Sequence, residues 1–227
     1  MKIIAGKYKN RNFYMPQGIR PTQNVVRKAL FDVLGQDMEG IDFLDLFAGS
    51  GAVGLEALSR GAKKVVFVDH DPRCIEVIEK NISLLKINLN PDMQDTGQRL
   101  SNGTGFFSVT PWSVGSTDFL KGSITSREVS SYEILSTDSF ALVKHLARQG
   151  KKFDITYVDP PYGLELAKKA LKTMEAHDIL HPNSLVIIQH ARKEFLPESA
   201  GRFIIFRQKR YGNTIVTIYN TIVKRDS

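Results

Sequence analysis

The run Asp159-Pro-Pro-Tyr162 follows a short apolar stretch at 155–158, and its residue types suit one kind of chemistry. The exocyclic amine of guanine or adenine is a weak nucleophile, because its lone pair is delocalised into the ring. A carboxylate and backbone carbonyls that accept its N–H bonds would localise that lone pair, and two prolines hold such carbonyls in a stiff turn. The ring of Tyr162 can stack on the base, which is worth roughly 1–3 kcal/mol. We therefore predict that Asp159, Pro160, Pro161 and Tyr162 bind and activate a base amine; the alternative is a Pro-Pro turn that ends a strand.

A glycine-rich turn, Asp45-Leu-Phe-Ala-Gly-Ser-Gly51, lies earlier, between an apolar run and a helical pattern. Gly49 and Gly51 permit a tight turn and let a ligand approach the backbone. Gly54 completes a G-x-G-x-x-G pattern, and Asp69 follows Gly49 by 20 residues, where a ribose-binding acid is expected. This pattern indicates a nucleotide-like cofactor, although it also fits a nicotinamide enzyme or a purely structural turn.

Charge separates these cofactors. A dinucleotide carries a pyrophosphate that Asp45 would repel, whereas S-adenosylmethionine has no phosphate and carries a sulfonium and an ammonium group. Asp69 could accept hydrogen bonds from both ribose hydroxyls, and Asp138, after a later strand, from the adenine amine. We therefore predict S-adenosylmethionine as the cofactor. The predicted cofactor contacts are Asp45, Phe47, Gly49, Gly51, Asp69, His70, Asp138 and Ser139.

The charge of the chain indicates an anionic partner. Its 31 Lys and Arg exceed its 24 Asp and Glu, which gives a net charge of +7. The range 1–28 contains seven basic residues and no acidic one, and a second basic stretch lies at 207–210. Such an excess favours nucleic acid as the partner, with a basic protein that binds no polyanion as the alternative. The predicted substrate contacts are Arg20, Thr22 and Arg210.

The single cysteine limits the other possibilities. Cys74 excludes an internal disulfide framework and a cysteine-based metal cluster, and we predict no metal site. No stretch approaches the roughly 18 apolar residues of a membrane span, and the N-terminus lacks the apolar core of a signal peptide. We expect a monomeric, cytoplasmic protein in which Cys74 and His190 have structural roles.

The elements that must position these residues alternate along the chain. The sequence first predicts a short strand at 2–5. A helix follows, with Thr22 as its predicted N-cap, and ends before Gly35. The pattern then predicts strands at 41–47, 64–68, 132–135, 153–158, 185–189, 202–208 and 214–223, and helices at 52–60, 71–86, 139–148 and 164–176. Such alternation predicts an α/β fold with a mostly parallel, seven-stranded sheet, helices on both faces and an antiparallel C-terminal hairpin.

We predict one domain boundary and one insertion. We predict an N-terminal extension at 1–37, made of a short hairpin and a helix, and a second domain at 38–227. The second domain carries an insertion at about 88–128, which is rich in Ser, Thr, Gly and Asn and contains the only tryptophan, Trp112. A structureless stretch of this length is unusual within a compact domain.

With these motifs in place, the sequence resembles the RsmD family of 16S rRNA guanine-N2 methyltransferases. The resemblance rests on Ile3-Ile-Ala-Gly-Lys-Tyr8, Arg20-Pro-Thr22, Ala29-Leu-Phe31, the long run from Asp45 to Ala62, Val66-Phe-Val-Asp69, Asp159-Pro-Pro-Tyr162 and Lys209-Arg-Tyr-Gly212. It implies a Rossmann-like class I methyltransferase fold, a target base at Asp159-Pro-Pro-Tyr162, and a segment at 20–22 that closes over the cofactor or guides RNA. Two departures are Thr137-Asp-Ser139, where Gly-Asp-Ala is expected, and Gln189, where an acid is frequent.

Two other functions fit the same residues. A DNA adenine-N6 methyltransferase could use the same four residues, although the chain has no evident target-recognition domain. A non-catalytic RNA-binding or ribosome assembly factor could keep the fold, although the presence of every expected acidic residue disfavours this hypothesis.

Overall fold

The computed structural model describes residues 1–19, 22–87 and 131–222. The helices are α1 (Asn24–Leu34), α2 (Ala52–Ser59), α3 (Pro72–Leu85), α4 (Ser139–Arg148) and α5 (Leu166–Ala176). The strands are β1 (Asp42–Leu46), β2 (Lys64–Asp69), β3 (Ser131–Ser136), β4 (Phe153–Val158), β5 (Leu180–Ala191), β6 (Ser199–Ala200), β7 (Phe203–Tyr211) and β8 (Thr214–Thr221).

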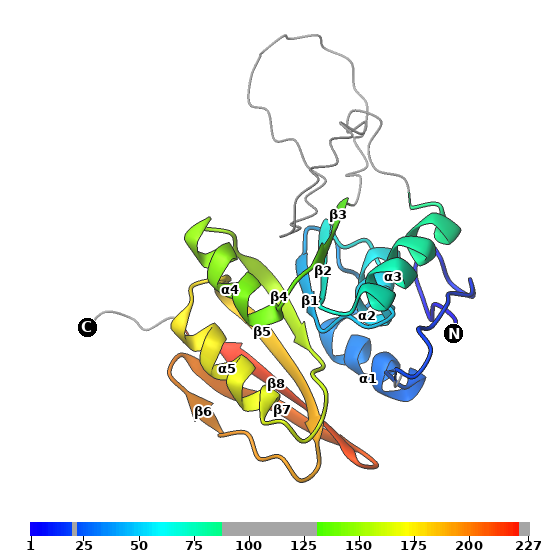
Figure 1. Ribbon diagram of the computed structural model, residues 1–227. Coiled ribbons are helices and arrows are strands. Elements are labelled where there is room, and N and C mark those ends of the chain that lie inside the picture. The colour runs from blue at the N-terminus through cyan, green and yellow to red at the C-terminus, as the bar shows by residue number, and fades with distance from the viewer. Residues whose placement is uncertain (20–21, 88–130, 223–227) are drawn as a thin grey trace, which may run out of the picture.

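These described strands form a single sheet in the order β3-β2-β1-β4-β5-β8-β7-β6 (Figure 1). Strands β1 to β5 are parallel, whereas β8 pairs antiparallel with β5 and β7 pairs antiparallel with β8. The prediction of a Rossmann-like α/β fold with an antiparallel C-terminal hairpin is confirmed. The eighth strand, which the sequence pattern did not predict, is the two-residue β6 at the edge beside β7.

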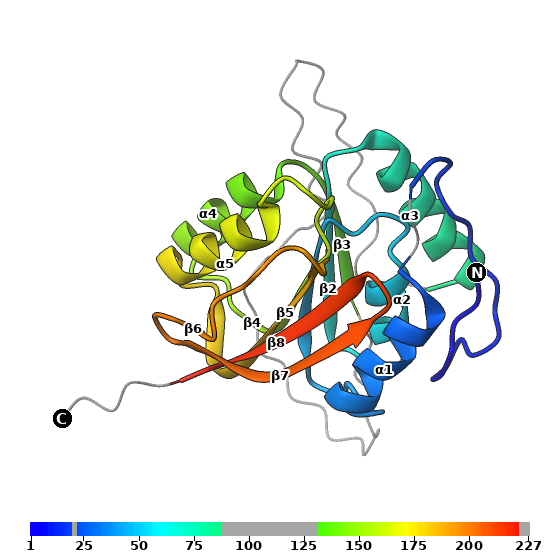
Figure 2. The same ribbon diagram turned by 90° about the horizontal axis from the view of Figure 1, so that it is seen from below.

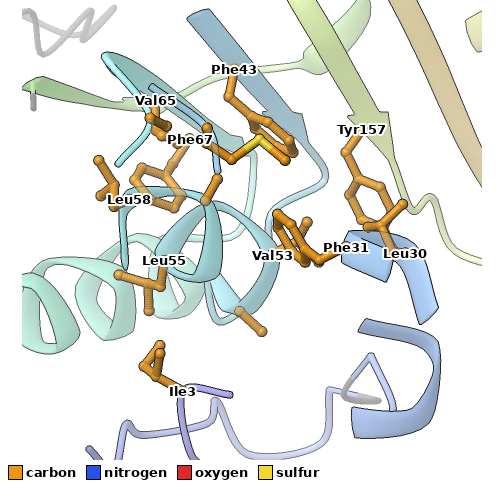
Figure 3. Packing of buried hydrophobic residues seen from close by; sticks show 14 of the residues in the cluster. Ile3, Leu30, Phe31, Phe43, Val53, Leu55, Leu58, Val65, Phe67 and Tyr157 are labelled. Carbon is orange, nitrogen blue, oxygen red and sulfur yellow. The ribbon is translucent and has the colours of Figure 1, made fainter. Parts of the chain in front are cut away.

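The helices form a layer on each face of the sheet. Helices α1, α2 and α3 cover one face, and α4 and α5 cover the other (Figure 2). The first face holds a buried cluster that includes Leu30 of α1, Leu55 of α2 and Phe67 of β2 (Figure 3). The other face holds a separate cluster under α4 and α5. Strands buried on both faces carry continuous apolar runs, as parallel strands between two helical layers must.

The N-terminal segment packs into the first of these two clusters. Ile3, Tyr8 and Phe13 belong to the same buried cluster as α1 and α2. The predicted strand at 2–5 is wrong, because only one isolated bridge forms, between Lys2 and Asn12. The backbone amides of residues 4 and 5 donate instead to the carboxylate of Glu56 on α2, so a buried acid replaces a partner strand. The division at residue 37 stays a prediction.

Two other features bear on the sequence predictions. The predicted insertion at 88–128, with Trp112, lies outside the described residues. Among the residues that are described, no helix is long and apolar enough to cross a membrane.

Candidate active site

A cavity of about 440 Å³ opens at the carboxyl ends of β1, β2 and β4. Adjacent parallel strands end at the same edge of a sheet, where open α/β folds bind ligands. The cavity is lined by Met15, Gly18, Ile19, Thr22, Phe47, Ala48, Gly49, Ser50, Asp69, His70, Asp71, Cys74, Asp159, Pro160, Pro161, Tyr162 and Gln189. The predicted base-binding run and part of the predicted cofactor turn therefore share one cavity.

The glycine turn after β1 is built from left-handed residues. Gly49 has a φ of +57° and Gly51, the N-cap of α2, a φ of +73°, which glycine adopts without steric cost. Phe47 has a φ of +60°, and its ring packs edge-on against Phe140 of α4, with centroids 5.7 Å apart. A bulky residue keeps such a backbone only where its surroundings hold it, so this wall of the cavity is firmly packed.

Asp69, at the end of β2, is held by backbone amides. Its Oδ2 accepts from the N–H of Gly49 at 2.8 Å, and its Oδ1 accepts from the N–H of Asp71 at 2.9 Å. The exposed His70 side chain lies nearby, with Nδ1 3.6 Å from Asp69 Oδ1. The carboxylate is thus fixed at the cavity edge, where the predicted ribose contact requires it.

Asp45 lies beneath the turn. Its side chain is buried, and its Oδ2 accepts from the N–H of Gly54 at 2.9 Å. Burial raises the pKa of Asp45 well above its ordinary value, and the charges of Asp159 and Asp69 raise it further, while the Gly54 N–H opposes the shift. Asp45 is absent from the cavity lining, and its predicted contact with the cofactor stays a prediction.

The run after β4 places a carboxylate and an aromatic ring together. Asp159 Oδ2 accepts from Thr22 Oγ1 at 3.1 Å and from Gln189 Nε2 at 3.0 Å. Tyr162 shares a hydrogen bond with Thr214 at 3.0 Å, between their hydroxyl oxygens. All four residues of the run line the cavity, which is the placement that activation of a base amine requires.

The role predicted for Thr22 as an N-cap is wrong. Helix α1 begins at Asn24 with Gln23 as its N-cap, and no side chain caps it. The Thr22 hydroxyl donates to Asp159 instead, and Thr22 lines the cavity. Its predicted contact with the substrate stays a prediction. Arg20 lies outside the described residues.

Some predicted contacts lie away from the cavity lining. Asp138 is the N-cap of α4 and accepts from the N–H of Ala141 at 2.8 Å, and Ser139 beside it is buried. Gly51 lies behind the turn, and Arg210 on the β7–β8 hairpin is exposed, with Nε donating to the Gly212 carbonyl at 3.0 Å. An acid before a helix suits both a cap and a ligand contact, so the sequence alone does not separate the two. The ligand roles of these residues stay predictions.

The cavity also contains residues that the sequence analysis did not assign to the site. Met15 and Ile19 reach it from the N-terminal segment, and no periodic pattern marks them. Gln189 follows the apolar run at 185–188 within β5, a position that could have identified it. Cys74 is buried at the cavity wall. Burial, and to a smaller extent the charge of Asp69, raises the pKa of Cys74 to about 12 and keeps it a neutral thiol. The buried His190 bonds Thr217 at 2.9 Å, a structural role as predicted.

The charges of the cavity lining suit a cationic cofactor. Asp69 and Asp159 line the cavity with Asp45 just beneath, and none of the described lining residues is Lys or Arg. A pyrophosphate would face uncompensated carboxylates here, whereas a sulfonium and an ammonium group would balance them. The apolar side chains of Met15, Ile19 and Phe47 suit the uncharged parts of such a ligand. The residues present therefore fit S-adenosylmethionine.

Comparisons with known proteins identify the family. The family model described as "Conserved hypothetical protein 95" matches residues 1–108 and 116–220. The chain belongs to this family, the RsmD family of methyltransferases. A relative from Escherichia coli strain K12, named Ribosomal RNA small subunit methyltransferase D, is 26% identical over 229 residues, covering 100% of this chain and 93% of the relative. The predicted family and the predicted enzyme class, a methyltransferase, are confirmed.

Solved structures share the fold of this RsmD-family chain. The structure of yhhF from Escherichia coli has a TM-score of 0.71 at 23% identity and covers 99% of each chain. An RNA methyltransferase from Salinibacter ruber, solved in complex with S-adenosyl-L-homocysteine, has a TM-score of 0.54 at 12% identity, covering 91% of this chain and 97% of that one. At these identities the likeness extends to the fold.

Proposed function

We propose that this RsmD-family chain transfers a methyl group from S-adenosylmethionine to the exocyclic N2 of a guanine in 16S rRNA. The observation that carries the proposal is the Asp159 carboxylate, which lies with Tyr162 in the same cavity as Asp69 and the glycine turn. A methyl donor bound at the turn and a base bound at Asp159 would then occupy adjacent parts of one cavity.

The bound cofactor supplies a methyl group on a positively charged sulfur. The lone pair of the guanine N2 forms the new N–C bond as the C–S bond breaks, the bonding electrons stay on sulfur, and N2 loses one proton to water. Asp159 accepts an N–H of the amine and so localises its lone pair, and the Tyr162 ring stacks on the base. Flipping a base out of its stack costs a few kcal/mol, and the stacking energy on Tyr162 offsets much of this cost.

The chemistry of Asp159 supports guanine over adenine. A carboxylate is an acceptor only. Guanine presents N1–H and N2–H side by side, so one carboxylate can accept from both. Adenine presents its amine beside the N1 acceptor, so its amine can donate to the carboxylate but offers no second donor beside it. A DNA adenine-N6 methyltransferase is therefore the less favoured alternative.

The substrate class follows from the relatives and the charge. Relatives named Ribosomal RNA small subunit methyltransferase D support rRNA, and the net charge of +7 supports a polyanion. The proposal includes the small ribosomal subunit as partner and the cytoplasm as compartment. It also includes a monomeric enzyme, and size-exclusion chromatography with light scattering tests this oligomeric state. It keeps Asp45, Phe47, Gly49, Gly51, Asp69, His70, Asp138 and Ser139 as cofactor contacts and Arg20, Thr22 and Arg210 as substrate contacts.

The test is transfer of labelled methyl to 16S rRNA, both free and in small subunits from cells that lack the modification, followed by nucleoside analysis. We expect N2-methylguanosine, and we expect Asp159→Ala to abolish it. The matched control is Asp32→Asn, which removes an exposed acid on α1 and should leave the rate unchanged. Calorimetry with S-adenosylhomocysteine shows whether each variant keeps its cofactor site.

Label recovered as N6-methyladenine in DNA would overturn the guanine assignment while leaving the cofactor and the fold. A cellular role in ribosome assembly that survives Asp159→Ala would favour a non-catalytic factor.

A further inference from the structure

The Gln189 side chain joins three residues of the active site. It lies at the carboxyl end of β5 and is only 6% exposed. Its Oε1 accepts from the Tyr157 hydroxyl at 2.9 Å, and its Nε2 donates to Asp159 Oδ2 at 3.0 Å and to the Tyr162 hydroxyl at 3.3 Å. One amide thus contacts the residue that would polarise the base amine and the residue that would stack on the base.

The orientation of the Gln189 amide follows from its neighbours Tyr157 and Asp159. That side chain is 1% exposed, and burial, together with the charges of Asp159 and Asp45, raises its pKa well above the ordinary value. Tyr157 therefore keeps its proton and can donate to the amide oxygen. The Asp159 carboxylate only accepts, so the amide nitrogen must be the group that faces it. The NH₂ group then points at Asp159 and Tyr162, where both of its hydrogens have acceptors.

Charge explains why a neutral donor suits this position. The ionisable groups that hydrogen-bond to the amide are Asp159, Tyr157 and Tyr162, and no described lining residue is Lys or Arg. The amide donates to Asp159 without adding a charge. A carboxyl group at the same place, where the family frequently has an acid, could donate to Asp159 only while it holds its proton, since two ionised carboxylates at hydrogen-bond distance repel each other.

We propose that Gln189 is a positioning residue for methyl transfer, which fixes the Asp159 carboxylate and the Tyr162 ring in one relative arrangement around the target base. The inference rests on the proposed function, because it assigns Gln189 a role at the base subsite rather than at the cofactor. It acts through Asp159 and Tyr162, the two residues to which its Nε2 donates.

Two variants test this role with the full-length enzyme. Gln189→Met keeps the length of the side chain and removes its hydrogen bonds. We expect kcat to fall by about 10- to 100-fold, as the loss of a hydrogen bond to a charged group implies, while the KM for S-adenosylmethionine stays within about twofold.

Gln189→Glu keeps the shape and makes the donor depend on pH. At low pH the introduced carboxyl holds a proton and donates to Asp159, as the amide does. As pH rises it ionises and repels Asp159, so kcat should fall along a descending limb that the wild type lacks. The introduced group has its pKa raised by Asp159, which places this limb above the ordinary value of about 4.3. A role confined to folding would give no such limb.

The matched control is Gln149→Glu, the same charge change at the exposed C-terminal end of α4, which should follow the wild-type pH profile. Calorimetry with S-adenosylhomocysteine shows that each variant is folded. A wild-type kcat for Gln189→Met, or a wild-type pH profile for Gln189→Glu, would overturn the inference and leave the proposed function standing. A wild type that methylates adenine instead would overturn the guanine assignment, and the same variants then decide the role of Gln189 on that reaction. A wild type that methylates no base would overturn both.

Discussion

At the scale of single residues, Thr22 connects two distant parts of the chain. Its hydroxyl donates to Asp159, 137 positions later, from the segment just before α1. Together with Gln189 it gives Asp159 Oδ2 two donors, one from the N-terminal segment and one from β5. A carboxylate held by two donors has a fixed plane, which matters for a group that must accept a particular N–H bond.

Thr22→Val tests this contact. The substitution keeps the branched shape and removes the hydroxyl, so we expect kcat for methyl transfer to fall about tenfold, corresponding to roughly 1.5 kcal/mol for a hydrogen bond to a charged group. The affinity for S-adenosylhomocysteine should change little. Thr22→Ser keeps the hydroxyl and should retain most of the rate; equal losses in the two variants would mean that the methyl group, rather than the hydrogen bond, matters.

Cys74 gives a prediction that depends on pH. Its pKa of about 12 lies above the ordinary value of 9.0, so the folded protein favours the neutral thiol. This contribution to stability is complete below about pH 9 and is lost as pH rises towards 12. Cys74 is the only cysteine, so alkylation by iodoacetamide reports on it alone. At pH 8 we expect labelling at least a hundredfold slower than in denaturant, since a three-unit rise in pKa lowers the thiolate fraction by orders of magnitude; labelling at the denatured rate would contradict the buried, neutral thiol.

At the scale of elements, helix α2 holds the N-terminal segment through one buried acid. Glu56 accepts from the amides of Ile4 and Ala5, both at 2.9 Å, and from Arg60 Nη2 at 2.9 Å. The buried Arg27 of α1 lies with Nε 3.6 Å from Glu56 Oε2. Two guanidinium groups and two amides therefore depend on one carboxylate, and this cluster fixes the segment from which Met15, Ile19 and Thr22 reach the cavity.

Glu56→Gln should destabilise the fold markedly. Removing the charge leaves Arg27 and Arg60 buried without a counter-ion, and breaking a buried pair in this way costs about 3–5 kcal/mol. Urea unfolding followed by circular dichroism measures the change. The control is Glu76→Gln on the exposed side of α3, which should shift the free energy of unfolding by less than about 0.5 kcal/mol. Equal values for both variants would show that the cluster contributes little to stability.

At the scale of the whole molecule, positive and negative charges are separated. The chain carries a net +7, yet its cavity contains carboxylates and no described Lys or Arg. Such a distribution suits two ligands of opposite charge, a cationic cofactor within the cavity and a polyanionic substrate across the surface.

Salt should therefore act on the two ligands differently. Each phosphate contact releases counterions, so the KM for rRNA should rise by about 20- to 40-fold between 50 and 200 mM salt, as roughly three contacts would produce. The KM for S-adenosylmethionine should stay within about twofold, since contacts inside the cavity are poorly screened. Steady-state kinetics with each substrate varied in turn measures both values; a salt-independent KM for rRNA would contradict binding through phosphates.

The sequence by itself determined the fold class, the order of most elements and the chemistry-bearing runs. These features are local: strand and helix periodicity, the glycine turn after β1 and Asp159-Pro-Pro-Tyr162 after β4 all lie within short stretches, and parallel strands bring their carboxyl ends to one edge. Only the tertiary structure decided that Thr22 and Gln189 meet at Asp159, that Asp45 lies beneath the turn, and that Asp138 caps α4. The reason is physical: a short polar side chain has several local partners of similar energy, and packing between residues far apart in the chain selects among them.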